Sequence, residues 1–95
     1  MEATLIRTNR DGHLMINLKI YDEGVYHAFT IMGKEVSYSV YKQRGELIAR
    51  SSAEVTDLQE SGNHITSMRV RTQAYEFEIE PGPNYTYRAY KLLEH

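Results

Sequence analysis

The chain contains no cysteine and no tryptophan, and only two of its 95 residues are proline. Without cysteine, a disulfide scaffold and a zinc site built on thiolates are excluded. No apolar run approaches the roughly 18 residues that a membrane-spanning helix needs. The first residues also lack the basic and apolar regions of a secretory signal. We therefore expect a cytoplasmic protein with no membrane partner and no cofactor.

Charge of either sign is not in excess, with 11 basic against 13 acidic side chains and a formal net charge of −2. This balance provides no bulk attraction for nucleic acid, which we do not expect as the main partner. A chain of this length predicts a single domain. We assign that domain to residues 1–92, because Leu93, Glu94 and His95 resemble the start of a vector-encoded histidine tag.

Glycine-containing turn signals divide the chain into segments in which apolar and polar residues alternate, as is typical of β-strands. Three of these signals are Glu23-Gly24, Gly33-Lys34 and Gln43-Arg44-Gly45. They share one register, in which Leu18 faces Phe29 and Phe29 faces Tyr38. We predict an all-β fold, an antiparallel meander of seven to eight strands. It should close as a small barrel or form a two-sheet sandwich, because an open meander would expose its strand edges.

The C-terminal third predicts a further hairpin around Gln73-Ala74. Its register opposes Arg71 to Glu76 and Arg69 to Glu78, which gives one face of alternating opposite charges. The returning last strand is expected to place Arg88 beside Glu76 or Glu78. We interpret this charged face as the solvated exterior of the fold.

The segment 46–59 fits two structures. Its apolar residues, among them Leu47 and Leu58, follow a helical stripe, yet the same residues can form a strand. The turn at Gln43-Arg44-Gly45 predicts that Val40 faces Ile48, which would place Ile48 on the interior face. One short helix in 46–59 therefore remains an alternative to a strand.

A row of aromatic residues is predicted on the face opposite the core, where Tyr21 faces Tyr26 and Tyr26 faces Tyr41. Tyrosine is enriched at the binding hot spots of protein interfaces. The candidate partner-binding residues on this face are Tyr21, Tyr26, Tyr41, Lys19, Met15 and Met32. They predict a platform for a protein partner or for self-association. The alternatives are a second buried layer, or a barrel that binds a small ligand or single-stranded nucleic acid.

Catalytic and metal-binding signatures are not found, so we expect an interaction module rather than an enzyme. His27 lies in the interior row between Ile20 and Val40. It is interpreted as a core histidine, with a general base inside the barrel as the alternative. Asp22, Glu23 and His27 have the composition of a metal site, but alternation along a strand separates neighbouring side chains. No catalytic and no metal-binding residue is therefore predicted.

Ala49-Arg50-Ser51-Ser52, the segment His64–Thr72 and the turn Pro81–Asn84 together look like the second half of roadblock/LC7 dynein-light-chain domains. This resemblance implies a homodimeric scaffold that binds motor or small-GTPase partners. That family has a long helix before the hairpin, whereas Val36–Gln43 here has the pattern of a strand.

Overall fold

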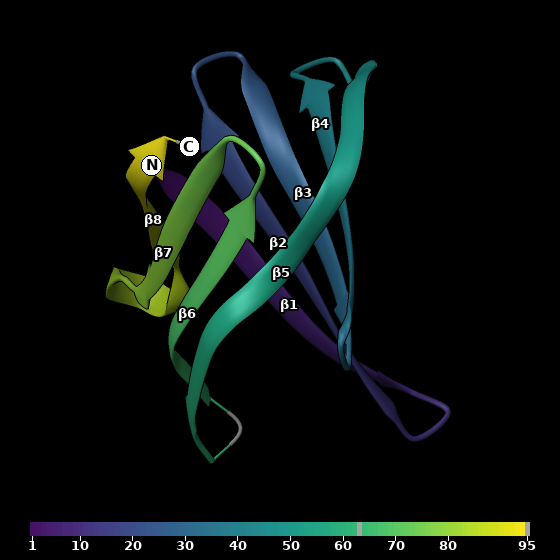
Figure 1. The fold of residues 1–95 in the computed structure, drawn as a ribbon. Coiled ribbons are helices and arrows are strands. Elements are labelled where there is room, and N and C mark those ends of the chain that lie inside the picture. The colour runs from purple at the N-terminus through teal and green to yellow at the C-terminus, as the bar shows by residue number, and fades with distance from the viewer. Residues whose placement is uncertain (63, 95) are drawn as a thin grey trace.

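The computed structural model describes residues 1–62 and 64–94. Its elements are β1 (Glu2–Arg10), β2 (His13–Asp22), β3 (Val25–Met32), β4 (Glu35–Lys42), β5 (Leu47–Ser61), β6 (His64–Thr72), β7 (Tyr75–Pro81), the 3-10 helix η1 (Pro83–Tyr85) and β8 (Tyr87–Glu94). Each strand pairs antiparallel with the next, and β8 returns to β1, so that the eight strands close a barrel (Figure 1). The all-β meander is confirmed, and of the two predicted closures the barrel is the one that forms.

Tight turns set the register of β2, β3 and β4 as the sequence predicts. Gly24 and Gly33 have φ values of +83° and +60°, a region that glycine enters without the steric strain of a Cβ atom. In the resulting ladders Leu18 faces Phe29, and Phe29 faces Tyr38. Because side chains alternate along each strand, this register sends one row of β2–β4 into the barrel and the other row outward.

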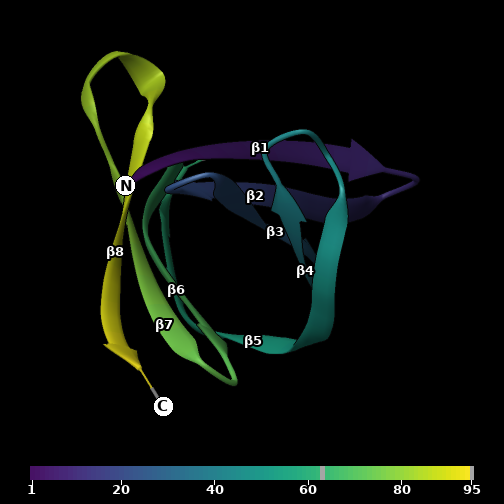
Figure 2. The ribbon, with the colours of Figure 1, turned by 90° about the horizontal axis from the view of Figure 1, so that it is seen from above.

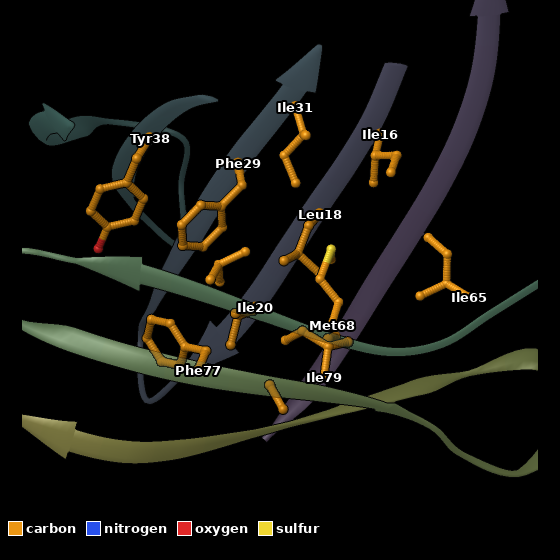
Figure 3. Close-up of a cluster of buried hydrophobic side chains, with 13 residues drawn as sticks. Ile16, Leu18, Ile20, Phe29, Ile31, Tyr38, Ile65, Met68, Phe77 and Ile79 are labelled. Atoms are coloured by element: carbon orange, nitrogen blue, oxygen red, sulfur yellow. The ribbon is translucent and has the colours of Figure 1, made fainter. Parts of the chain in front are cut away.

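The inward rows fill the barrel with apolar side chains (Figure 3). The buried hydrophobic residues are Ala3, Ile16, Leu18, Ile20, Phe29, Ile31, Tyr38, Ile65, Met68, Val70, Phe77, Ile79 and Ala89. The Phe29 ring stacks on Tyr38 with centroids 4.7 Å apart and meets the edge of Phe77 at 6.3 Å. A barrel of eight strands has room for little more than its own side chains, and here they occupy the middle of the barrel.

Strand β5 is continuous over Leu47–Ser61, so a helix in 46–59 is wrong. Its first part pairs with β4 and its second part pairs with β6. A β-bulge interrupts the first ladder, because Val40 faces Ala49 while Tyr41 faces Leu47. The extra residue, Ile48, is 49% exposed, so its predicted interior position and its pairing with Val40 are also wrong.

The C-terminal hairpins confirm one predicted register and correct another. Arg71 faces Glu76 and Arg69 faces Glu78, as expected. Arg88 lies opposite Glu80 rather than Glu76 or Glu78, because β7 and β8 resume pairing at Pro81 and Tyr87. Strand β8 includes Leu93 and Glu94, two of the three residues that resemble the start of a tag, whereas His95 lies outside the described residues.

The structure does not contain the long helix that the roadblock/LC7 resemblance implies. Within residues 1–62 and 64–94 the only helical element is η1, and Glu35–Lys42 forms strand β4. The resemblance is therefore unsupported by the fold. No helix in the described part of the chain is long and apolar enough to cross a membrane.

The barrel closes through a short seam between β1 and β8. Among the residues that the structure describes, only Glu2 and Ala3 of β1 pair with β8, opposite Arg88 and Tyr87. The Ala89 N–H adds a 2.8 Å hydrogen bond to the Met1 carbonyl, and the Met1 amino group donates to the Ala89 carbonyl at 3.0 Å. Beyond this point the two strands diverge (Figure 2).

Candidate functional site

The outward side chains of β2, β3 and β4 form the aromatic row that the sequence predicts. Tyr21 pairs with Tyr26, and Tyr26 pairs with Tyr41. The ring centroids of Tyr21 and Tyr26 are 6.0 Å apart, and those of Tyr26 and Tyr41 are 5.1 Å apart in a stacked arrangement. We call these three residues the tyrosine row.

The tyrosine row lies on the exterior of the barrel and is not a buried layer. Tyr21 is 43% exposed, while Tyr26 and Tyr41 are half-buried by their stacking. The Lys19 ammonium lies 5.5 Å from the centre of the Tyr26 ring, within cation–π distance. Leu47, opposite Tyr41 on β5, is also exposed and extends the apolar surface. The predicted second buried layer is therefore wrong.

A hollow beside the row brings charged groups close to the aromatic rings. Its volume is about 440 Å³, and it extends from Tyr21 and Tyr26 to the turn between β2 and β3. The carboxylates of Glu2 and Glu23 line the hollow together with Lys19. The surface therefore combines aromatic faces with groups of both signs, an arrangement that suits a protein partner better than a polyanion.

Met15 and Met32 form a separate patch. They face one another across β2 and β3, as predicted, and Met32 is exposed. Along β2, Met15 is six residues from Tyr21, which corresponds to roughly 20 Å of strand. Of the residues predicted around the tyrosines, the structure therefore brings Lys19 to the row and leaves the two methionines at the opposite end of the barrel.

Comparisons with protein-family models, curated proteins and solved structures found no match to this chain. The proposed function of this chain therefore rests on the geometry of the site. Within the described ranges, no group of three or more His, Cys, Asp or Glu side chains is arranged to hold a metal ion.

His27 lies inside the barrel and is only 4% exposed. Its Nδ1 is 2.7 Å from the Tyr38 hydroxyl, and its Nε2 is 3.7 Å from Asp22 Oδ2. When the Tyr38 hydroxyl donates to Nδ1, the ring proton is on Nε2 and faces the Asp22 carboxylate. Burial lowers the pKa of His27 below its ordinary value of 6.5, although the negative charge of Asp22 opposes this shift. Burial likewise raises the pKa of Tyr38 to about 12.

The surroundings of His27 favour its interpretation as a core histidine. The rings of Tyr38, Phe77 and Tyr75 have centroids 5.9, 5.1 and 5.9 Å from the imidazole. If His27 acted as a general base, a substrate that approached its imidazole would have to displace these rings. The polar contact Asp22 is itself bound by the Lys91 ammonium at 3.2 Å. Lys91 could not be predicted as a neighbour of Asp22 from the sequence, because this contact depends on closure of the barrel by β8.

Proposed function

We propose that this protein is a non-enzymatic interaction module that binds a protein partner through the tyrosine row. The observation that carries the proposal is the stacking of Tyr21, Tyr26 and Tyr41 on the exterior of strands whose inward rows already form the core. Hydrophobic core formation does not require three aromatic rings on this face. An exposed aromatic cluster of this kind is typical of a recognition surface.

The arrangement of the row supports binding at low entropic cost. Tyr26 is held between Tyr21 and Tyr41 on regular strands, so its ring is ordered before a partner arrives. Side chains that are already ordered lose less conformational entropy on binding. The tyrosine hydroxyls can still exchange hydrogen bonds with water or with a partner, because a tyrosine ring has an apolar body and a polar end.

The charges near the row favour a partner segment that carries basic side chains. Glu2 and Glu23 lie at the hollow beside Tyr21, where a lysine or arginine of the partner could contact both a carboxylate and an aromatic face. The same carboxylates repel the negatively charged phosphate backbone of a nucleic acid. Nucleic acid, which proteins bind with an affinity that falls steeply as the salt concentration rises, is therefore the less favoured partner.

The experiment that tests this function is selection of peptides from a displayed random library on the purified protein. We expect enriched peptides with basic and aromatic residues. Their affinity should fall by at least about tenfold in Tyr26→Ala, as is usual for an interface hot spot. Thr30→Ala, on the outer face of the same strand, should retain binding. Peptides that bind equally well to both variants would contradict the proposal.

A hollow at the opposite end of the barrel favours the second candidate, a small-ligand site. It has a volume of about 550 Å³ and is lined mainly by apolar side chains, including Leu14, Ile16, Ile31 and Leu58. Leu14 and Leu58 are each at least 40% exposed there, and ligands often bind at the mouths of β-barrels. Binding of an apolar fluorescent dye that Leu58→Gln abolishes and Tyr26→Ala leaves intact would favour this candidate.

A further inference from the structure

The tyrosine row continues into two exposed aliphatic side chains at the start of β5. Leu47 faces Tyr41 across the ladder between β4 and β5, and Ile48 is the extra residue of the β-bulge that follows. Leu47 is 44% exposed and Ile48 is 49% exposed. In a ladder without the bulge, Ile48 would face Val40, which packs against the core. The bulge therefore keeps a large apolar side chain out of the core and leaves it at the end of the tyrosine row.

We call Leu47 and Ile48 the aliphatic pair. Burial of an isoleucine side chain stabilises a fold, and the bulge gives up this contribution at Ile48. Bulges re-aim side chains and are over-represented next to active sites. With the tyrosine row, the aliphatic pair forms one partly apolar surface that crosses β2, β3, β4 and β5. Exposed apolar surface that is contiguous in this way is typical of an interaction site.

The two ends of this surface carry opposite charge. At the β2 end, Glu2 and Glu23 line the hollow, and among the described residues neither carboxylate has an ion-pair partner. At the β5 end, Arg44 in the preceding turn and Arg50 on β5 are exposed, and within the described ranges they also lack an ion-pair partner. A basic side chain is therefore attracted to the β2 end and repelled from the β5 end.

Lys19 determines which ring of the row is left for a cation. Its ammonium lies 5.5 Å from the centre of the Tyr26 ring, so this ring already has a cation within cation–π distance. Tyr26 also lies between Tyr21 and Tyr41. Tyr21 is the most exposed ring of the row and lines the hollow together with Glu23. A basic side chain of a partner therefore fits at Tyr21 rather than at the centre of the row.

The width of the surface sets the spacing of the partner's side chains. Tyr21 on β2 and Leu47 on β5 are three strand spacings apart, which corresponds to roughly 14 Å. An extended chain advances roughly 3.3 Å per residue, so residues four positions apart span roughly 13 Å. Because side chains alternate along an extended chain, these two residues also point to the same side. The residue midway between them points the same way and lies over Tyr26 and Tyr41.

We propose that the partner is an extended peptide segment that crosses β2 to β5, with a lysine or arginine beside Tyr21 and a branched aliphatic residue four positions away on Leu47 and Ile48. This proposal names the class of partner for the tyrosine row, and it therefore rests on the proposed function. Strands β3 and β4 are paired on both sides, so the peptide is recognised through its side chains rather than by adding a strand. Its basic residue contacts a ring and a carboxylate, and its aliphatic residue covers the aliphatic pair.

Displayed peptide libraries of fixed spacing test the proposal. Each peptide carries one arginine and one leucine that are two, four or six positions apart, in either order, and its other positions are drawn from small polar and aromatic residues. All three spacings keep the two side chains on one side of an extended chain, so only the distance between them differs. Selection on the purified protein should enrich the four-position spacing at least about tenfold over the other two. Equal enrichment of the three spacings, or enrichment of none, would overturn the proposal.

Double-mutant cycles between the protein and a selected peptide assign the two ends of the surface. Ile48→Thr retains a β-branched residue in the strand and should weaken binding roughly fivefold. This loss should disappear when the leucine of the peptide is replaced by alanine, because the contact between the two side chains can be removed only once. Glu23→Gln should weaken binding roughly threefold, and this loss should disappear when the arginine of the peptide is replaced by glutamine.

Two matched variants outside the surface serve as controls. Ile6→Thr makes the same exchange at an exposed position of β1, and Glu35→Gln removes an exposed carboxylate at the opposite end of the barrel. Both should leave binding unchanged. Binding that Tyr26→Ala abolishes but that shows no coupling at Ile48 and Glu23 would overturn this proposal and leave the proposed function standing. Binding that Tyr26→Ala leaves unchanged would contradict both.

Discussion

The wall formed by β2, β3 and β4 differs sharply from the seam between β1 and β8. In the wall, eight residues of β2 pair with β3 and eight residues of β4 pair with β3, over tight turns. At the seam, only Glu2 and Ala3 pair with β8 in the described part of the chain. The wall therefore provides a rigid support for the tyrosine row, whereas the seam leaves most of β1 with a free edge. The following predictions sharpen or break this difference.

The largest effect is expected from the inner side of the wall. Phe29→Ala removes a fully buried ring that packs on Tyr38 and Phe77, and should lower the free energy of unfolding by about 3–5 kcal/mol. Tyr21→Ala, on the outer side of the same wall, should cost no more than about 1 kcal/mol because 43% of this residue is already exposed in the folded protein. Urea unfolding measures both values. Equal losses would mean that the tyrosine row is part of the stabilising core.

A smaller effect is expected at the seam. Ala3→Pro removes an N–H that points toward β8, and should cost about 1–3 kcal/mol by urea unfolding. Amide hydrogen exchange should accelerate in β8 while β3 remains protected, because the seam opens without unfolding the wall. Uniform acceleration in all strands would show that wall and seam open together, and the distinction between them would fail.

The pH dependence of stability is expected to come from the side of the barrel where His27 meets Asp22. The folded-state pKa of His27 is lowered by burial, so below its ordinary value of 6.5 the unfolded chain binds more protons than the folded one. The contribution of neutral His27 to the free energy of unfolding should be fully present above about pH 6.5. The free energy of unfolding should fall as the pH drops from there toward the lowered pKa. His27→Gln should lose this slope in thermal unfolding at pH 5 to 7. The matched His13→Gln variant changes an exposed histidine and should retain it.

The smallest effect is expected on the charged exterior. The guanidinium of Arg69 and the carboxylate of Glu78 lie 3.3 Å apart, but both side chains contact solvent. Glu78→Gln should change the free energy of unfolding by less than about 0.5 kcal/mol, because exposed ion pairs contribute little. Urea unfolding in low and high salt checks this. A loss above about 1 kcal/mol would show that the exterior charges stabilise the barrel more than solvated pairs usually do.

The hairpins could be predicted from sequence because their registers depend on neighbouring residues. Gly24 and Gly33 fix the turns, and each turn then fixes which residues face one another, including Tyr21 and Tyr26. The position of the tyrosine row followed directly. Its exposure did not follow, because burial depends on whether another layer covers the face, and no local pattern reports that.

The wrong or missing predictions concern residues where the strand pairing shifts along a strand, or where a contact joins distant parts of the chain. Ile48 was misplaced because a bulge in β5 adds one residue, and a pattern of period two contains no signal for the insertion. Arg88 was misplaced because its register is set by the loop that contains η1 rather than by a two-residue turn. Lys91 could not be assigned to Asp22, since 69 residues separate them along the chain.

The pairing order of the strands has a consequence for how the barrel is made. Every ladder except the seam joins strands that are consecutive in the chain, so the wall can assemble from local contacts as the chain emerges during synthesis. The seam alone joins the first strand to the last. Until β8 is complete, the nascent chain holds a nearly finished sheet whose β1 edge is unprotected along its whole length. The completed β8 then protects the edge at Glu2 and Ala3. Translation speed in the last third of the message therefore sets how long these first residues of β1 are open to neighbouring nascent chains.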